Sequence, residues 1–194
     1  MIRYSLITIL LLLASFVIQQ FIPAFTGLSH SRILLVQLVF LCCAVTVGQP
    51  TMLLLAFLGG FLWDAQCALG PHGGSPEVYT HPIESMRFGY SILLFGGMGF
   101  LMQGIQPLFK QGKWQFSALL SGIAVFLYLI SEYAMINFIR GEFVLTRATV
   151  FQMAHTAVLT MLFSPIVFWL LFSIAAQCDH SINPEAGRKR RRAH

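Results

Sequence analysis

Six apolar stretches, separated by polar or helix-breaking residues, set the pattern along the chain. Most have a length near the roughly 20 residues that an α-helix needs to cross the hydrocarbon core of a bilayer. The pattern therefore predicts an all-α fold, a polytopic membrane helical bundle with about six transmembrane helices. We expect an integral membrane domain over residues 1–177, with helices at 4–22, 33–47, 51–69, 86–105, 114–139 and 148–176.

Proline and glycine mark the ends of these stretches. Pro23 ends the first stretch, and Gly48, Gln49 and Pro50 separate the second from the third. Proline disfavours a helical conformation in the residue before it and suits the first turn of a new helix, so this break predicts a tight turn between two helices. One long kinked helix is the alternative. Residues 70–84 hold three prolines and three glycines, which predicts one long loop.

The composition points to a membrane rather than to water. Hydrophobic residues make up 57% of the chain and charged residues 10%, whereas a soluble domain carries about 25% charged residues. A single globular core in a chain of this size does not bury so much apolar surface, but a bilayer covers it.

The net charge of +5 comes from the C-terminal end of the chain. In a six-helix layout, eight Lys and Arg residues fall on the side of the termini and four on the other side, which predicts cytoplasmic termini. We expect residues 178–194 to form a disordered cytoplasmic tail that contacts anionic lipid and binds no nucleic acid. The basic residues of this tail are Arg188, Lys189, Arg190, Arg191 and Arg192.

Two acidic residues fall within the apolar stretches. Asp64 is at the end of the third expected helix and Glu132 is inside the fifth, on the same helix face as Tyr128. An ionised carboxylate in hydrocarbon is costly unless it faces protein, water or a partner. For Asp64 the alternatives are a hydrated helix end, a bond to a neighbouring helix, or contact with a ligand or partner. For Glu132 they are a buried hydrogen bond, a ligand or proton site, or a side chain that reaches the membrane interface.

Small residues and one proline are the candidates for helix packing. Glycine lets helix backbones approach each other in lipid, so we expect the third and fourth helices to pack closely together or against a helix of another protein. Proline in a helix frees a carbonyl and bends the axis, and neighbouring groups must then satisfy that carbonyl. Together with Asp64, Tyr128 and Glu132, the candidates for helix packing or partner binding are Gly59, Gly60, Gly89, Gly96, Gly97 and Pro165.

The sequence offers no motif for catalysis. The metalloprotease pattern H-E-x-x-H and the Walker A loop do not occur in it. Ser121 and His155 are the residue types of an intramembrane serine protease, but Leu119 stands where that motif has glycine. We therefore expect no enzyme activity, no catalytic residue, no cofactor and no metal site.

The segment from Gly59 to Asp64 resembles the glycine–x–x–x–aspartate signature of the rod shape-determining MreD family, with Gly60 and Asp64 at the matching positions. Residues 88–99 resemble the glycine-containing helix that follows in that family. The last apolar stretch, with Pro165, is similar to its terminal helix. The loop at 70–84 is longer than the usual turn of the family.

This resemblance implies a non-enzymatic, multi-pass protein of the bacterial inner (plasma) membrane that supports lateral peptidoglycan synthesis and cell shape. The implied partners are an MreC-like protein, a RodA-type glycosyltransferase with its transpeptidase, and the MreB filament. The family's fold is similar to that of the substrate-binding components of energy-coupling transporters. A substrate-binding membrane subunit of a vitamin-type transporter is therefore the alternative function.

Overall fold

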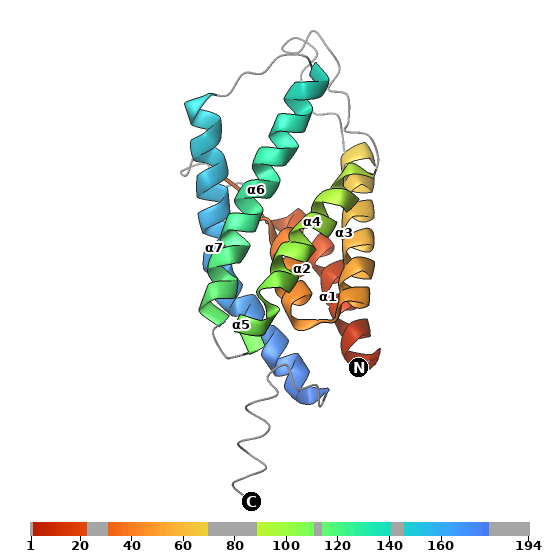
Figure 1. The fold of residues 1–194 in the computed structure, drawn as a ribbon. Coiled ribbons are helices and arrows are strands. Elements are labelled where there is room, and N and C mark those ends of the chain that lie inside the picture. Colours follow the sequence, from red (N-terminus) through yellow and green to blue (C-terminus); the bar gives the residue numbers. More distant parts are fainter. Residues whose placement is uncertain (1, 23–30, 70–88, 111–113, 141–145, 179–194) are drawn as a thin grey trace, which may run out of the picture.

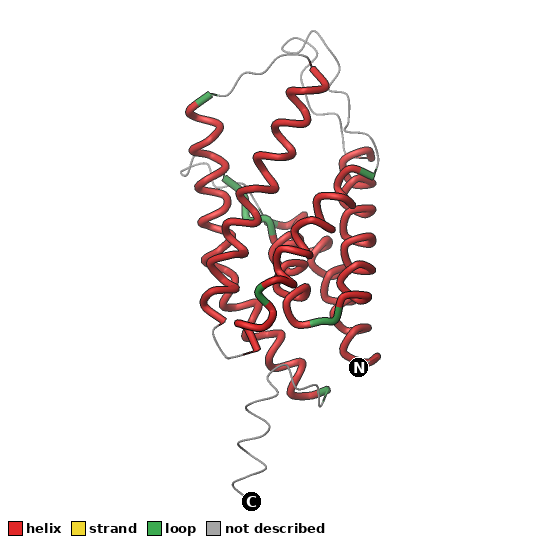
Figure 2. The backbone as a smooth tube through the Cα atoms, in the orientation of Figure 1, coloured by secondary structure: helices red, strands yellow, loops and turns green. Residues whose placement is uncertain are grey.

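The computed structural model describes residues 2–22, 31–69, 89–110, 114–140 and 146–178. These residues form helices and no strand, so the predicted all-α class is confirmed for the described part of the chain (Figures 1 and 2). The helices are α1 (Ile2–Phe21), α2 (Leu35–Thr46), α3 (Gln49–Leu69), α4 (Tyr90–Gly104), α5 (Gln106–Lys110), α6 (Trp114–Arg140) and α7 (Arg147–Gln177).

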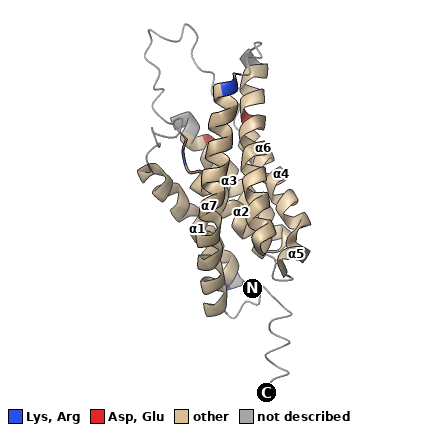
Figure 3. Cartoon of the chain, turned by 90° about the vertical axis from the view of Figure 1, so that its left-hand side faces the viewer, with Lys and Arg blue, Asp and Glu red and all other residues tan. Residues whose placement is uncertain are grey.

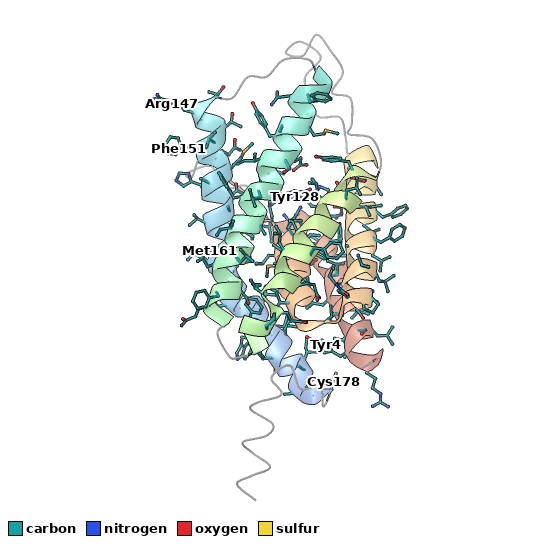
Figure 4. All side chains as sticks on the ribbon, in the orientation of Figure 1. Tyr4, Tyr128, Arg147, Phe151, Met161 and Cys178 are labelled. Atoms are coloured by element: carbon teal, nitrogen blue, oxygen red, sulfur yellow. The ribbon has the colours of Figure 1, made fainter. Side chains whose placement is uncertain are left out.

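The long helices alternate in direction along the bundle. In Figure 1, α1, α3 and α6 run upward, while α2, α4 and α7 run downward. Val47 and Gly48 form the turn between the antiparallel helices α2 and α3. Tyr4 and Cys178 lie at the same lower end, and Arg147 lies at the opposite end (Figure 4).

Three helices are long and apolar enough to cross a membrane, which agrees with the membrane character expected from the sequence. They span Arg3–Phe21, Gln115–Phe138 and Arg147–Gln177. Large apolar side chains are exposed on their outer faces, among them Leu10, Phe138 and Trp169. In water such a surface is costly, whereas lipid tails solvate it.

Two other apolar helices are shorter than a bilayer is thick. At 1.5 Å per residue, α2 with 12 residues and α4 with 15 residues extend about 18 Å and about 22 Å. The hydrocarbon core is about 30 Å thick. The backbone groups at the ends of these helices therefore need partners from the protein, because lipid offers none.

Helix α2 is the centre of the bundle. Every residue from Val36 to Thr46 is buried, and α2 contacts all six other helices. A helix that is apolar all round and enclosed all round is typical of the interior of a large protein or of a membrane bundle. The remaining helices thus form a layer around α2.

The N-terminal end of α2 is bonded by side chains from α1 and α7. The side-chain amide of Gln19 donates to the Ile33 carbonyl at 2.7 Å and accepts from the Leu35 N–H at 2.6 Å. The Thr160 hydroxyl accepts from the Leu34 N–H at 3.2 Å. Two surrounding helices thus satisfy backbone groups that would otherwise be orphaned at the start of a helix.

The C-terminal end of α2 is bonded in the same manner from α4 and α5. The Gln103 side chain donates to the carbonyls of Ala44 and Val47 at 2.7 and 3.0 Å. The Gln106 side chain donates to the carbonyls of Val45 and Val47 at 3.0 and 2.9 Å. Both ends of α2 are therefore closed by glutamine amides from neighbouring helices.

The helix limits differ modestly from those expected from the apolar pattern. Helices α1 and α3 each start two residues earlier, and α2 is shorter at both ends. The short helix α5 was not predicted. It holds Pro107 in its first turn, a position that proline tolerates. Helix α7 continues through Pro165, and its lower part turns away from the direction of its upper part (Figure 1).

Removing the glutamine bond to α2 should destabilise the bundle. We expect Gln19→Leu to lower the free energy of unfolding by about 1–3 kcal/mol, because the Ile33 carbonyl and the Leu35 N–H lose their partner away from water. The measurement is thermal unfolding of the purified protein in detergent. Gln20→Leu is the matched control, since Gln20 is the next residue and is exposed. Equal unfolding temperatures for the two variants would contradict this role of Gln19.

Candidate functional site

Helices α3 and α4 make the closest backbone approach among the glycine positions, and Gly60 is where they meet. A Cβ atom on Gly60 would lie 2.5 Å from both the Cα and the N of Ile92. No side chain fits at that distance, so only glycine allows the two backbones to touch. Gly59 faces the Phe95 ring and Leu12, with a Cβ contact of 3.0 Å to the ring. The structure thus brings two of the predicted packing glycines into the α3–α4 contact.

Asp64, one turn beyond Gly60 on α3, binds the start of α4. Its Oδ2 accepts a hydrogen bond from the Gly89 N–H at 2.6 Å. Gly89 precedes the first residue of α4 and has a φ of 104°, a left-handed conformation that L side chains rarely adopt. The carboxylate also lies at the positive end of the α4 dipole, where negative charge is favourable. Asp64 is buried. Among the alternatives considered for Asp64, the structure therefore shows the hydrogen bond to a neighbouring helix.

We call Gly60, Asp64 and Gly89 the α3–α4 clasp. Gly60 allows the close approach, Asp64 fixes the position of the α4 N-terminus, and Gly89 provides the backbone conformation that presents its N–H. Residues 70–88, which include the long loop expected at 70–84, lie outside the described residues. The clasp joins the two described segments on either side of them.

Other predicted packing residues face away from the bundle. A Cβ atom on Gly96 or Gly97 would meet nothing within 4 Å, and Gly97 is exposed. Pro165 is exposed on α7. The basic tail at 188–192 lies outside the described residues. The predicted packing glycines within α3 and α4 therefore divide into an internal pair, Gly59 and Gly60, and an external pair, Gly96 and Gly97.

Three aromatic rings form a layer in the interior. Phe40 of α2 contacts Phe95 of α4, with ring centroids 5.0 Å apart, and Phe95 contacts Tyr128 of α6 edge-on at 6.0 Å. Phe40, Phe95 and Tyr128 are almost fully buried. Pairs of this geometry are stabilising beyond the area they bury. The aromatic layer fixes the relative height of α2, α4 and α6.

Polar residues stand one turn above each of these rings. Residues three or four apart share a helix face, so Gln37 lies next to Phe40, Ser91 next to Phe95, and Glu132 next to Tyr128 on their helices. The polar residue precedes the ring on α2 and α4, which run downward, and follows it on α6, which runs upward. All three polar residues therefore lie on the side of the rings toward the upper end of the bundle (Figure 1). We call these three residues, together with Asp64, which bonds to Gly89 two residues before Ser91, the polar layer.

The two acidic residues of the polar layer are the only ones in the described part of the chain. They belong to α3 and α6 and are 68 positions apart in the sequence. Figure 3 shows both acidic positions in the half of the bundle away from the chain termini. Within the described residues, neither carboxylate forms an ion pair with a basic side chain.

Gln37 and Ser91 were not predicted as site residues. Gln37 lies in an apolar stretch and is fully buried, and both polar atoms of its amide have no hydrogen-bond partner among the described residues. Ser91 is 1% exposed, and its hydroxyl also has no hydrogen-bond partner among the described residues. The sequence does show each of them as a polar residue inside an apolar stretch. Whether such a residue belongs to a site depends on which other helices face it.

The polar layer consists of groups that form hydrogen bonds. The described residues contain no group of three or more His, Cys, Asp or Glu that could hold a metal ion. The polar layer holds two carboxylates, an amide and a hydroxyl, which together accept and donate hydrogen bonds. These residues suit recognition of a polar or cationic group.

Comparison of the chain with protein-family models, with curated proteins and with solved structures finds no match. Assignment of a function therefore rests on the residues themselves. The features that carry it are the α3–α4 clasp, the external glycines and the polar layer.

Gly60 should tolerate no side chain. We expect Gly60→Ala to destabilise the protein by about 1–3 kcal/mol, because the added methyl group forces the α3 and α4 backbones apart. Gly97→Ala is the control, since the same change there meets open space and improves helix propensity. Thermal unfolding in detergent compares the two. An unfolding midpoint for Gly60→Ala equal to that for Gly97→Ala would refute the close approach.

Asp64 should act in the clasp as a hydrogen-bond acceptor. Asp64→Ala removes the partner of the Gly89 N–H and should cost about 0.5–2 kcal/mol, as is usual for loss of a helix cap. Asp64→Asn keeps an acceptor oxygen at the same position and should retain most of the stability. The unfolding midpoints of the two variants give the comparison. A loss as large in Asn as in Ala would assign the effect to the charge instead.

Proposed function

We propose that this protein is a non-enzymatic component of the bacterial cell-elongation complex, which binds an MreC-like partner within the inner membrane and so supports lateral peptidoglycan synthesis and cell shape. The observation that carries the proposal is the α3–α4 clasp. The two residues on which the resemblance to the MreD family rests, Gly60 and Asp64, act together to hold two helices in fixed positions. Their role is architectural, as a scaffold requires.

The external glycines offer a place for the partner. On α4, Gly97 is exposed and lies between Leu93 and Leu101, which are 73% and 49% exposed. Glycine flanked by large apolar residues lets a second membrane helix approach closely while its side chains pack on either side. We place the membrane helix of the MreC-like partner on this face of α4.

The membrane arrangement is part of the proposal. Six crossings bring both termini to one side, and the lower end of the bundle holds Tyr4 and Cys178 (Figure 4). With the excess of Lys and Arg on the side of the termini, we propose that this end is cytoplasmic. The resemblance to the MreD family makes a RodA-type glycosyltransferase with its transpeptidase and the MreB filament the further partners of this proposal.

A second candidate function is that of substrate-binding membrane subunit of a vitamin-type transporter. The buried, unpartnered side chains of Gln37 and Ser91 favour it, because a ligand site needs a few polar groups in an apolar interior. The two candidates differ in their protein partners. A scaffold associates with a single-span periplasmic protein, and a transporter subunit associates with ATPases.

Capture of the tagged protein from its native membrane in mild detergent should recover a single-span MreC-like protein. We expect Gly97→Leu to reduce this recovery at least 5-fold, because the larger side chain fills the face on which the partner helix packs. Quantitative mass spectrometry of the captured proteins provides the measurement. Recovery of transporter ATPases without an MreC-like protein would favour the second candidate.

The Gly97→Leu variant needs a control for surface bulk alone. Leu93→Ala makes the side chain one helical turn before Gly97 smaller. Val158→Leu makes an exposed side chain on α7 larger. We expect Val158→Leu to capture the partner as well as the wild type does. Equal loss in both bulky variants would remove α4 as the docking face.

A further inference from the structure

We propose that the corner between α1 and α2 binds phospholipid phosphate groups through Arg32, in a part of the bilayer that is thinner than the part around α6 and α7. The corner consists of residues 31–34, which precede α2. The inference goes beyond the scaffold function and depends only on the chain being embedded in a bilayer. It rests on the height of the corner, on the apolar lengths of the two sides of the bundle, and on the charge of Arg32.

The corner lies far below the upper end of α7. The Leu34 N–H donates to the Thr160 hydroxyl at 3.2 Å, which places the corner at the height of Thr160. Thr160 is 13 positions beyond Arg147, the first residue of α7, so about 20 Å of helix rises above this contact. Figures 1 and 3 show the upper parts of α6 and α7 rising past the level at which α2 begins. The two sides of the bundle therefore end at different heights.

The apolar outer surface also differs in length between the two sides. On α1, Gln19 bonds the corner and lies 16 positions beyond the exposed Arg3, a length of about 24 Å. On α7, Phe151 is 61% exposed and lies 26 positions before Gln177, which corresponds to about 39 Å along the helix. The hydrocarbon core of a bilayer is about 30 Å thick. It is thicker than the α1 side requires and thinner than the α7 side requires.

Helix α6 agrees with α7 in this respect. Phe138 is 79% exposed and lies 23 positions beyond Gln115, a length of about 35 Å. Tilting the whole molecule does not remove the difference from α1, because the two surfaces of a flat bilayer are parallel and cover the same length on both sides. A bilayer accommodates short and long helices by local thinning and thickening. We therefore infer a step in bilayer thickness around the protein.

Arg32 supplies the charge on the thin side. Its side chain is exposed and forms no ion pair with another residue in the described part of the chain. A guanidinium group in hydrocarbon is costly, and local thinning that brings lipid headgroups to it lowers the cost. Guanidinium groups match the geometry of phosphate and bind it through paired hydrogen bonds. The phosphate of a phospholipid is therefore the partner that suits this position.

The backbone of the corner is bonded as such a depth requires. The Gln19 side chain bonds the Ile33 carbonyl and the Leu35 N–H, and Thr160 bonds the Leu34 N–H. Lipid offers no partner to backbone groups, so irregular backbone at membrane depth needs partners from the protein. These bonds allow the corner to lie next to lipid without orphaned amides.

Spin labels on Ile18→Cys and Phe151→Cys measure the step. Both positions are exposed, on α1 and on α7. Ile18 precedes Gln19 and Phe151 is nine positions above Thr160, so the labels differ in height by about 15 Å. The native cysteines that react with the label are replaced by serine, and the protein alone is reconstituted into vesicles of dioleoylphosphatidylcholine.

The accessibility of each label to oxygen and to a water-soluble nickel complex gives its depth below the lipid phosphates. In a flat bilayer the two depths differ by the whole height difference. In a stepped bilayer, the depths should differ by less than half of it, because the phosphates follow the protein surface on each side. A difference larger than half would overturn the proposal.

Substitutions of Arg32 test its contact with phosphate through the label at position 18. We expect Arg32→Leu to place this label deeper by about 4 Å or more, because the headgroups are no longer drawn to the corner. Arg32→Lys keeps the charge and should retain most of the wild-type depth. Arg3→Leu is the control, since it removes an exposed arginine at the other end of α1 and should leave the depth unchanged.

An unchanged label depth in Arg32→Leu would overturn the role of Arg32 as the phosphate contact. Circular dichroism and size-exclusion chromatography establish that each variant is folded. The comparison of the two labels needs no change at Arg32, so it decides the proposal even where Arg32→Leu does not fold. The vesicles contain no MreC-like protein, so this proposal and the scaffold function fail separately.

Discussion

The fold depends on hydrogen bonds that side chains make to the backbone at the two ends of α2. A helix of 12 residues cannot carry its termini out of a hydrocarbon layer about 30 Å thick, and lipid satisfies no N–H or carbonyl. Gln19 and Thr160 bond the N-terminal end, while Gln103 and Gln106 bond the C-terminal end. Because these residues come from α1, α7, α4 and α5, the same bonds that permit a short central helix also position the helices around it.

The α3–α4 clasp adds a second fixed contact on one side of this centre. Gly60 sets how closely the helices pack, and Asp64 sets where α4 begins. Since α4 contributes Gln103 to the α2 terminus and Phe95 to the aromatic layer, the position of its first residue is linked to both. The site residues and the core are therefore parts of one arrangement, and a change in the clasp reaches the polar layer through α4.

The apolar pattern was sufficient for the fold class and for the approximate limits of most helices, because burial in lipid acts on whole stretches of sequence. It did not show that α2 is central, since an apolar helix facing lipid and one facing protein have the same composition. For the same reason the spacing of Gly96 and Gly97 did not distinguish an external face from an internal one. Gln37 and Ser91 were missed because their neighbours come from other helices. Asp64 was identified, but its hydrogen bond to Gly89 joins positions 25 apart, a connection that the sequence alone does not show.

The enclosure of α2 has a consequence for biogenesis. As the chain leaves the ribosome, α1 and α2 reach the membrane before α4, α5 and α7 have been synthesised, yet three of the four residues that bond the ends of α2 belong to those later helices. During that interval its terminal amides and carbonyls need water at the bilayer surface or the polar interior of an insertion machine. The surroundings of α2 are therefore complete only when the helices that follow it in the chain, α4, α5 and α7, have reached their positions.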